Sequence, residues 1–150
     1  MINNTIQDLD KEVSALRKFI DILTSEQKAL LDNAFEQLIP LSETKTQAAG
    51  ELMEIINLRR NSLLTNGTDN MESWLAKHAP AGQALWNEIR KLAEQAQNIN
   101  TINGELINSR LRHNQQALSV LHNASKNAAG LYGPDGQTNL SSSGRHLGSV

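Results

Sequence analysis

Residues 2–39, INNTIQDLDKEVSALRKFIDILTSEQKALLDNAFEQLI, decide the fold, because their apolar side chains recur at alternating steps of four and three residues. The mean step of about 3.5 residues is the period of a coiled-coil seam. No Gly or Pro occurs before Pro40, so the pattern predicts one helix over Thr5–Ile39, about 50 Å long. The seam positions are Ile2, Ile6, Leu9, Val13, Leu16, Ile20, Leu23, Gln27, Leu30, Ala34 and Leu38.

Pro40 divides this segment from the next helical pattern. Proline lacks a backbone N–H and disfavours a helical conformation in the residue before it. We therefore expect a break or a sharp kink at Pro40, followed by a second helix over Leu41–Leu64. Lys45 and Arg59 fall on the apolar face of that helix, which predicts a weaker seam than in the first helix.

Residues 65–70, TNGTDN, form a turn-rich loop whose Asp69 or Asn70 can cap a short helix over Met71–His78. Pro80 then suits the start of another helix. The apolar periodicity that follows predicts one long helix over Ala81–Asn127, about 70 Å in length.

Two residues inside the predicted long helix interrupt its apolar pattern. Asn103 is a polar residue on the seam, and a single seam Asn fixes the register of helix pairing at some cost in stability. Gly104 lowers helix propensity by about 1 kcal/mol, which we interpret as a close helix–helix crossing. Both residues are therefore assigned to register and packing.

Residues 128–150 show no sustained periodicity and are rich in Gly and Ser. The sequence thus predicts a helical domain over residues 1–127 and a flexible C-terminal tail over residues 128–150. The predicted fold is all-α, an elongated antiparallel helical hairpin or coiled-coil-like bundle of three to four helices. With 3% aromatic residues, its core is expected to be thin and built from Leu and Ala.

Composition excludes several classes of protein. The chain has no Cys and a net charge of −2, which excludes a disulfide framework and argues against nucleic-acid binding. No apolar run is long enough to insert into a membrane, and residues 1–10 lack the pattern of a signal peptide. A cytoplasmic location is expected.

Catalytic and metal-binding patterns are not evident. The four His residues are scattered, without the spacing of a helical metal site. Residues 133–136, GPDG, lack the Lys and the following helix of a phosphate-binding loop and read as a turn. We expect no enzyme activity, no metal and no cofactor.

Three segments of the C-terminal third carry a family resemblance: NTINGELI (100–107), NQQALSVL (114–121) and LYGPDGQT (131–138). In this order and at these separations, they resemble the FlgN family of flagellar type III export chaperones. The resemblance implies a cytoplasmic chaperone that holds the terminal helical segment of the hook-associated proteins FlgK and FlgL. It also implies delivery to the export gate protein FlhA, with Leu131 and Tyr132 of the tail contacting the gate or the client.

An amphipathic helix can cover the apolar stripe of a client helix. The candidate client-binding residues lie at the end of the predicted long helix, which extends past the first helix: Leu111, Ala117, Leu118, Val120 and Leu121. The alternative for these residues is that they form the core of the hairpin. The alternative function is a structural coiled-coil scaffold or self-assembly protein, and self-association remains open for the chaperone too.

Overall fold

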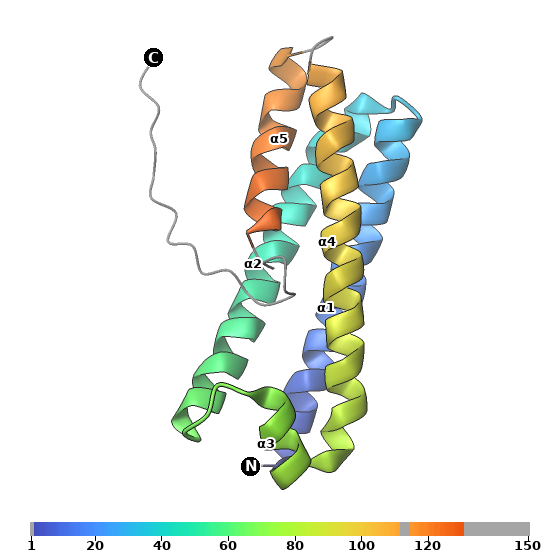
Figure 1. Cartoon of the computed structure of the whole chain (residues 1–150). Helices are drawn as coiled ribbons and strands as arrows, with labels where there is room; N and C mark the ends of the chain where they lie inside the picture. Colours follow the sequence, from blue (N-terminus) through green and yellow to red (C-terminus); the bar gives the residue numbers. More distant parts are fainter. Residues whose placement is uncertain (1, 112–114, 131–150) are drawn as a thin grey trace.

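The computed structural model describes residues 2–111 and 115–130. Its elements are α1 (Ile2–Leu31), α2 (Phe35–Thr65), α3 (Met71–His78), the short 3₁₀ helix η1 (Pro80–Gly82), α4 (Gln83–Leu111) and α5 (Gln115–Ala129). The four long helices alternate in direction along an elongated bundle (Figure 1). No strand occurs among the described residues, and the predicted all-α, antiparallel fold is confirmed.

The first helix buries the predicted seam but ends earlier than expected. The fully buried Leu9, Leu16, Leu23 and Leu30 all occupy seam positions. The helix stops at Leu31, where Asn33 adopts a left-handed conformation with φ of 56°. Around it the Ala34 N–H donates to the Ala29 carbonyl at 2.9 Å, as in a Schellman C-cap.

The predicted break at Pro40 is therefore wrong. α2 begins at Phe35 and runs through Pro40 without interruption. The chain reverses at Asn33 because Asn tolerates the left-handed conformation that a helix C-cap requires. Pro40 lies on an exposed position near the start of α2.

The short connecting helix is confirmed. α3 spans Met71–His78, and the Asn70 side chain accepts a hydrogen bond of 3.0 Å from the Ser73 N–H. This is the capping contact that the sequence predicts, and Asn70 rather than Asp69 makes it. η1 then leads into α4 at the lower end of the bundle (Figure 1).

The single long helix predicted over Ala81–Asn127 is wrong. Helix α4 ends at Leu111, and α5 runs back along α4 and α2 (Figure 1). A straight helix would carry the apolar face of its last turns past the end of α1 and into water. Reversal instead buries side chains of α5 against the bundle, which is the favourable arrangement for apolar surface. These buried residues are Leu121, Ala124, Ser125 and Ala128.

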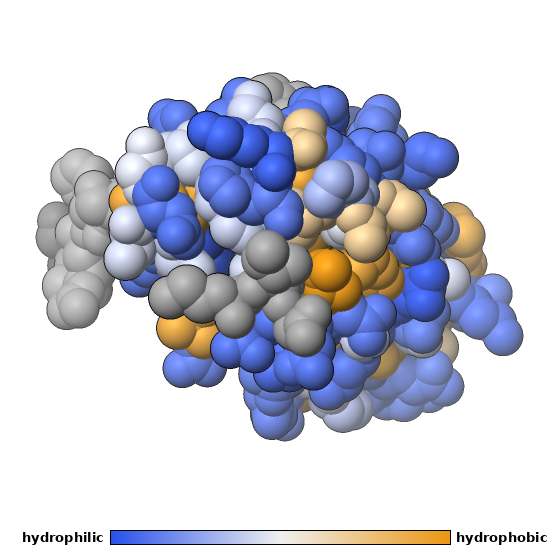
Figure 2. Space-filling model, turned by 90° about the horizontal axis from the view of Figure 1, so that it is seen from below, coloured by the Kyte–Doolittle hydropathy of each residue, from blue (hydrophilic) through white to orange (hydrophobic). Residues whose placement is uncertain are grey.

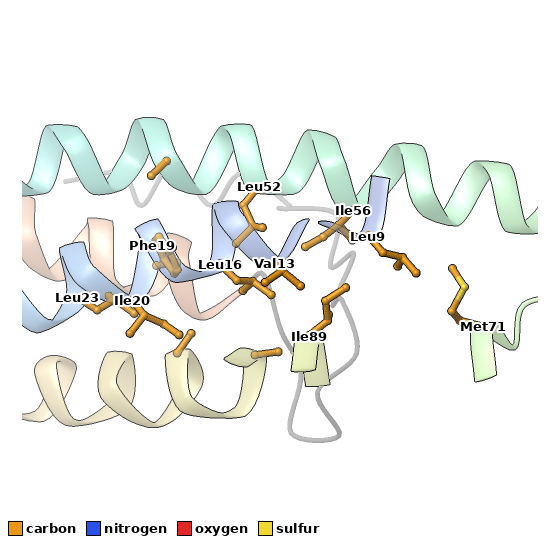
Figure 3. Packing of buried hydrophobic residues seen from close by; sticks show 14 of the residues in the cluster. Leu9, Val13, Leu16, Phe19, Ile20, Leu23, Leu52, Ile56, Met71 and Ile89 are labelled. Carbon is orange, nitrogen blue, oxygen red and sulfur yellow. The ribbon is translucent and has the colours of Figure 1, made fainter. Parts of the chain in front are cut away.

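The core is divided into two clusters along the bundle. The larger cluster joins α1, α2, α3 and α4 with Ala128 of α5, and Figure 3 shows Leu52 and Ile56 of α2 extending toward Leu16 and Val13 of α1. The smaller cluster lies near the turn between α1 and α2, where α5 also packs; its buried members are Ala29, Leu30, Leu38, Ile107 and Leu121. α5 thus completes the core at one end of the bundle.

The surface at the α3 end is mostly hydrophilic, with a small apolar area near its centre (Figure 2). None of the helices within the described ranges combines the length and hydrophobicity needed to cross a membrane. The predicted tail, apart from the last residues of α5, falls outside the described residues and stays a prediction.

Candidate functional site

A buried polar layer joins three helices next to the smaller cluster. The Lys45 ammonium of α2 donates to both carboxylate oxygens of Glu26 of α1, at 3.0 and 3.3 Å. Asn103 of α4 donates from Nδ2 to Glu26 Oε1 at 2.9 Å and to the Leu23 carbonyl at 2.8 Å. The Lys45 and Glu26 side chains are each 1% exposed, so the layer lies in the core.

Burial of this layer changes the acid–base behaviour of Lys45. Desolvation lowers the pKa of the Lys45 ammonium from its usual 10.5, and the attraction and hydrogen bond of Glu26 oppose that shift. Desolvation is the larger effect, because a charged amine loses its hydration when it is buried. The protonation state of Lys45, and with it the stability of the contact between α1 and α2, therefore depends on pH.

A second buried ion pair joins α1 and α2 nearer the α3 end. Arg59 binds the Glu12 carboxylate through Nε at 2.7 Å and through Nη2 at 3.2 Å. Its guanidinium also lies 4.8 Å from the centre of the Trp86 ring of α4. Lys45 and Arg59, the two cations on the α2 seam, therefore each pair with a carboxylate of α1, and the weaker seam predicted for α2 stays a prediction.

Among the predicted client-binding residues, Leu121 has a described side chain. It is 1% exposed and belongs to the cluster with Leu30, Leu38 and Ile107. The sequence leaves open whether Leu121 is a client contact or a core residue, and in this conformation it lies in the core because α5 folds back. Leu111 ends α4, and Ala117, Leu118 and Val120 lie in α5; their side chains are outside the described set.

Gly104 lies where α5 approaches α4 closely. A Cβ atom built on Gly104 would lie 3.1 Å from Ser125 Oγ of α5, which is tighter than ordinary contact. The neighbouring Asn100 donates from Nδ2 to the Ser125 carbonyl at 3.2 Å. Small residues thus bring α5 against α4 at this point.

Polar atoms at the seam between α4 and α5 are not all paired. A solvent-open groove of about 260 Å³ runs along the outside of this seam, and its lining includes the exposed Thr101, Glu105 and Lys126 beside Gly104 and Ser125. Within the described part of the chain, Asn100 Oδ1, Asn103 Oδ1 and His122 Nδ1 are buried without a hydrogen-bond partner. Such groups lower the stability of the packed state.

Three of the groups in these polar contacts, Glu12, Glu26 and Asn100, are not among the residues that the sequence singles out. A signal for two of them exists: Glu12 and Glu26 are fourteen residues apart, as are Lys45 and Arg59. Because α1 and α2 are antiparallel, equal spacing lets Glu26 face Lys45 at one level of the bundle and Glu12 face Arg59 at another. Asn100 has no comparable signal.

Metal ligands do not converge in the described ranges, where no group of three or more His, Asp or Glu side chains is placed to hold an ion. His78 lies at the surface, with Nδ1 at 3.1 Å from the Trp74 carbonyl and its ring stacked on Trp74. Leu131 and Tyr132 lie outside the described residues, so their predicted contacts are untested.

Comparison with known proteins identifies the family. The FlgN protein family matches residues 1–140. The chain belongs to the FlgN family. The match includes the helical bundle and the LYGPDGQT segment of the tail, and it confirms the resemblance drawn from three C-terminal segments.

Two curated relatives are similar over nearly the whole FlgN-family chain. A protein of Yersinia enterocolitica serotype O:8 named flagella synthesis protein FlgN is 29% identical over 142 residues, which is 94% of each chain. Another Yersinia enterocolitica protein of that name is 28% identical over the same length. No solved structure matches the chain. Membership of this family supports a role in building the flagellum.

Proposed function

We propose that this FlgN-family protein is an export chaperone of the bacterial cytoplasm. It binds the terminal helical segment of the hook-associated proteins FlgK and FlgL, prevents their premature assembly and delivers them to the export gate protein FlhA. The observation that carries the proposal is the family match over residues 1–140, which includes both the bundle and the tail motif.

The described helices support a role in helix binding. An amphipathic helix that leaves its assembly exposes an apolar stripe, and a partner helix can cover that stripe. In this chain the proposed client contacts are Leu111, Ala117, Leu118, Val120 and Leu121. Leu121 belongs to an apolar face that already packs against helices α2 and α4.

Binding a client helix, as proposed, requires neither a catalytic group nor a cofactor. The buried polar groups pair with one another, as in Glu26 with Lys45 and Glu12 with Arg59, which is a structural arrangement. We therefore assign the protein to binding rather than catalysis, with no cofactor. Tyr132 of the tail is proposed to contact the gate, because a rigid ring with a hydroxyl is a suitable anchor.

A binding experiment tests the proposal directly. The purified chain is titrated calorimetrically with the C-terminal helical segment of FlgK or of FlgL. We expect one-to-one complexes of micromolar or better affinity. Absence of binding to both segments contradicts the chaperone function, whatever the fold.

The proposed contact residues are tested with Leu118→Asp combined with Leu121→Asp. A carboxylate on an apolar contact face is costly to bury, so client pull-down should be lost. Circular dichroism must show that the double variant remains helical, because Leu121 is also a core residue. A helical variant that still binds the client refutes these contacts.

A further inference from the structure

The apolar face of α5 is occupied in the free chain. Leu121 packs with Leu38 of α2 and Ile107 of α4, and its side chain is 1% exposed. Figure 1 shows α5 lying along these two helices over the half of the bundle that contains the α1–α2 turn. A partner helix cannot contact Leu121 while α5 stays in this position.

The interface that holds α5 against the bundle has few large apolar side chains and leaves buried polar atoms without hydrogen bonds. Beyond Leu121, its buried residues among those described are small: Ala124, Ser125 and Ala128. A solvent-open groove of about 260 Å³ follows the outside of the same seam, so water reaches the edge of this interface. Asn100 Oδ1 and His122 Nδ1 remain buried without partners there, within the described residues, which disfavours the packed state.

We propose that the inner face of α5 binds two partners in turn: helices α2 and α4 in the free chain, and the amphipathic terminal helix of the client in the complex. This inference rests on the proposed chaperone function and specifies its binding surface. The described inner residues Leu121, Ala124 and Ala128 are spaced by three and four positions, so they form one face of a helix. Such a face is complementary to the apolar stripe of another helix.

The free chain with α5 packed is thus a closed form that does not bind the client. When only the open form is competent, the apparent affinity is the intrinsic affinity reduced by the open fraction. Fixing α5 in place must weaken client binding. Loosening α5 by a change outside its own inner face must strengthen client binding.

A disulfide tests the first consequence. Gly104→Cys with Ser125→Cys places two thiols where a Cβ at position 104 lies 3.1 Å from the Ser125 Oγ position. A disulfide needs Cβ atoms roughly 3.5–4.5 Å apart, which this crossing provides. The chain has no other Cys, so the bond is unique and the reduced form of the same variant is the control.

We expect the oxidised form to bind the FlgK or FlgL segment at least about tenfold more weakly than the reduced form. Equal affinity of the two forms overturns the inference. Failure of the two thiols to oxidise also counts against it, because α5 would then not occupy this position in solution.

A glycine substitution tests the second consequence. In Gly104→Leu the leucine Cβ alone lies 3.1 Å from Ser125 Oγ, so the substitution crowds this crossing and disfavours the packed position of α5. Gly50→Leu is the matched control, because a Cβ at position 50 of α2 meets nothing within 4 Å. Both changes raise helix propensity equally, so their difference isolates the contact with α5.

Gly104→Leu should bind the client segment several-fold more tightly than wild type, and Gly50→Leu should match wild type. A Gly104→Leu affinity equal to or weaker than that of Gly50→Leu overturns the inference. The two proposals fail differently. A wild-type chain that binds neither client segment refutes the chaperone function, whereas a wild-type chain that binds, with equal oxidised and reduced affinities, refutes only the closed form.

Discussion

Asn103 Nδ2 donates a hydrogen bond of 2.9 Å to Glu26 Oε1, and this carboxylate also accepts a hydrogen bond from Lys45. One side chain each from α1, α2 and α4 therefore meets in a single buried layer. Sliding any of the three helices by one turn would separate these groups and leave a charge unpaired in the core, which is costly. The layer thus fixes the register of the three helices.

Asn103→Asp should destabilise the bundle. The new carboxylate would face the buried Glu26 carboxylate in place of a donor, and we expect a loss of about 3 kcal/mol in the free energy of unfolding. Urea unfolding followed by circular dichroism measures the change. Asn98→Asp, an exposed position of the same helix, is the control, and equal losses for the two variants would argue against the register role.

Lys45→Met should leave the Glu26 carboxylate buried without its cation. Unlike a neutral lysine amine, Met cannot donate hydrogen bonds to the buried carboxylate, so we expect a loss of about 3 kcal/mol in the free energy of unfolding. Adding Glu26→Gln removes that charge while keeping an acceptor for Asn103, so the double variant should recover most of the loss. Urea unfolding of both variants provides the comparison; a double variant no more stable than Lys45→Met would contradict the ion-pair explanation.

The lowered pKa of Lys45 predicts a specific pH dependence. In the folded chain Lys45 releases its proton below 10.5, the ordinary value that it takes when unfolded. Between the lowered pKa and 10.5 the unfolded state binds more protons, so this group makes the free energy of unfolding rise with pH. Urea unfolding from neutral pH to 10.5 should show this increment in wild type relative to Glu26→Gln/Lys45→Met. A constant difference between the two proteins would refute the prediction.

Arg59→Lys should destabilise the bundle although it keeps the positive charge. Lysine loses both the two-point contact with Glu12 and the stacking on Trp86, and we expect a loss of about 1–2 kcal/mol. Arg17→Lys is the control, since its ion pair with Glu88 is largely exposed and should change stability by less than about 0.5 kcal/mol. Thermal unfolding of both variants measures the difference, and equal shifts would contradict the role given to Arg59.

Tyr132→Ala should separate client binding from delivery. If the tail contacts the gate, the variant keeps its affinity for the FlgK segment while secretion of FlgK and FlgL falls. Tyr132→Phe keeps the ring and should retain most of the secretion. Calorimetry and assays of secreted protein measure the two properties, and normal secretion by Tyr132→Ala would remove the gate role from this residue.

Several parts of the fold and site follow from local sequence. The step pattern of α1 places Leu9, Leu16 and Leu23 in the core, and Asn70 caps α3 as predicted. Asn103 contacts Glu26 of α1 and Gly104 lies against Ser125 of α5, at the two positions where the sequence interrupts an apolar face. Each of these features depends on neighbours within a few turns of the same helix, which periodicity and capping rules describe.

The sequence by itself therefore determined the all-α class, the seam of α1 and the family. Only the tertiary structure decided where the chain reverses and what its buried polar groups contact. The turn at Asn33, rather than Pro40, and the return of α5 both depend on apolar area that becomes buried only when distant helices meet. For the same reason the sequence leaves Leu121 open between a client contact and a core position, and the fold places it in the core.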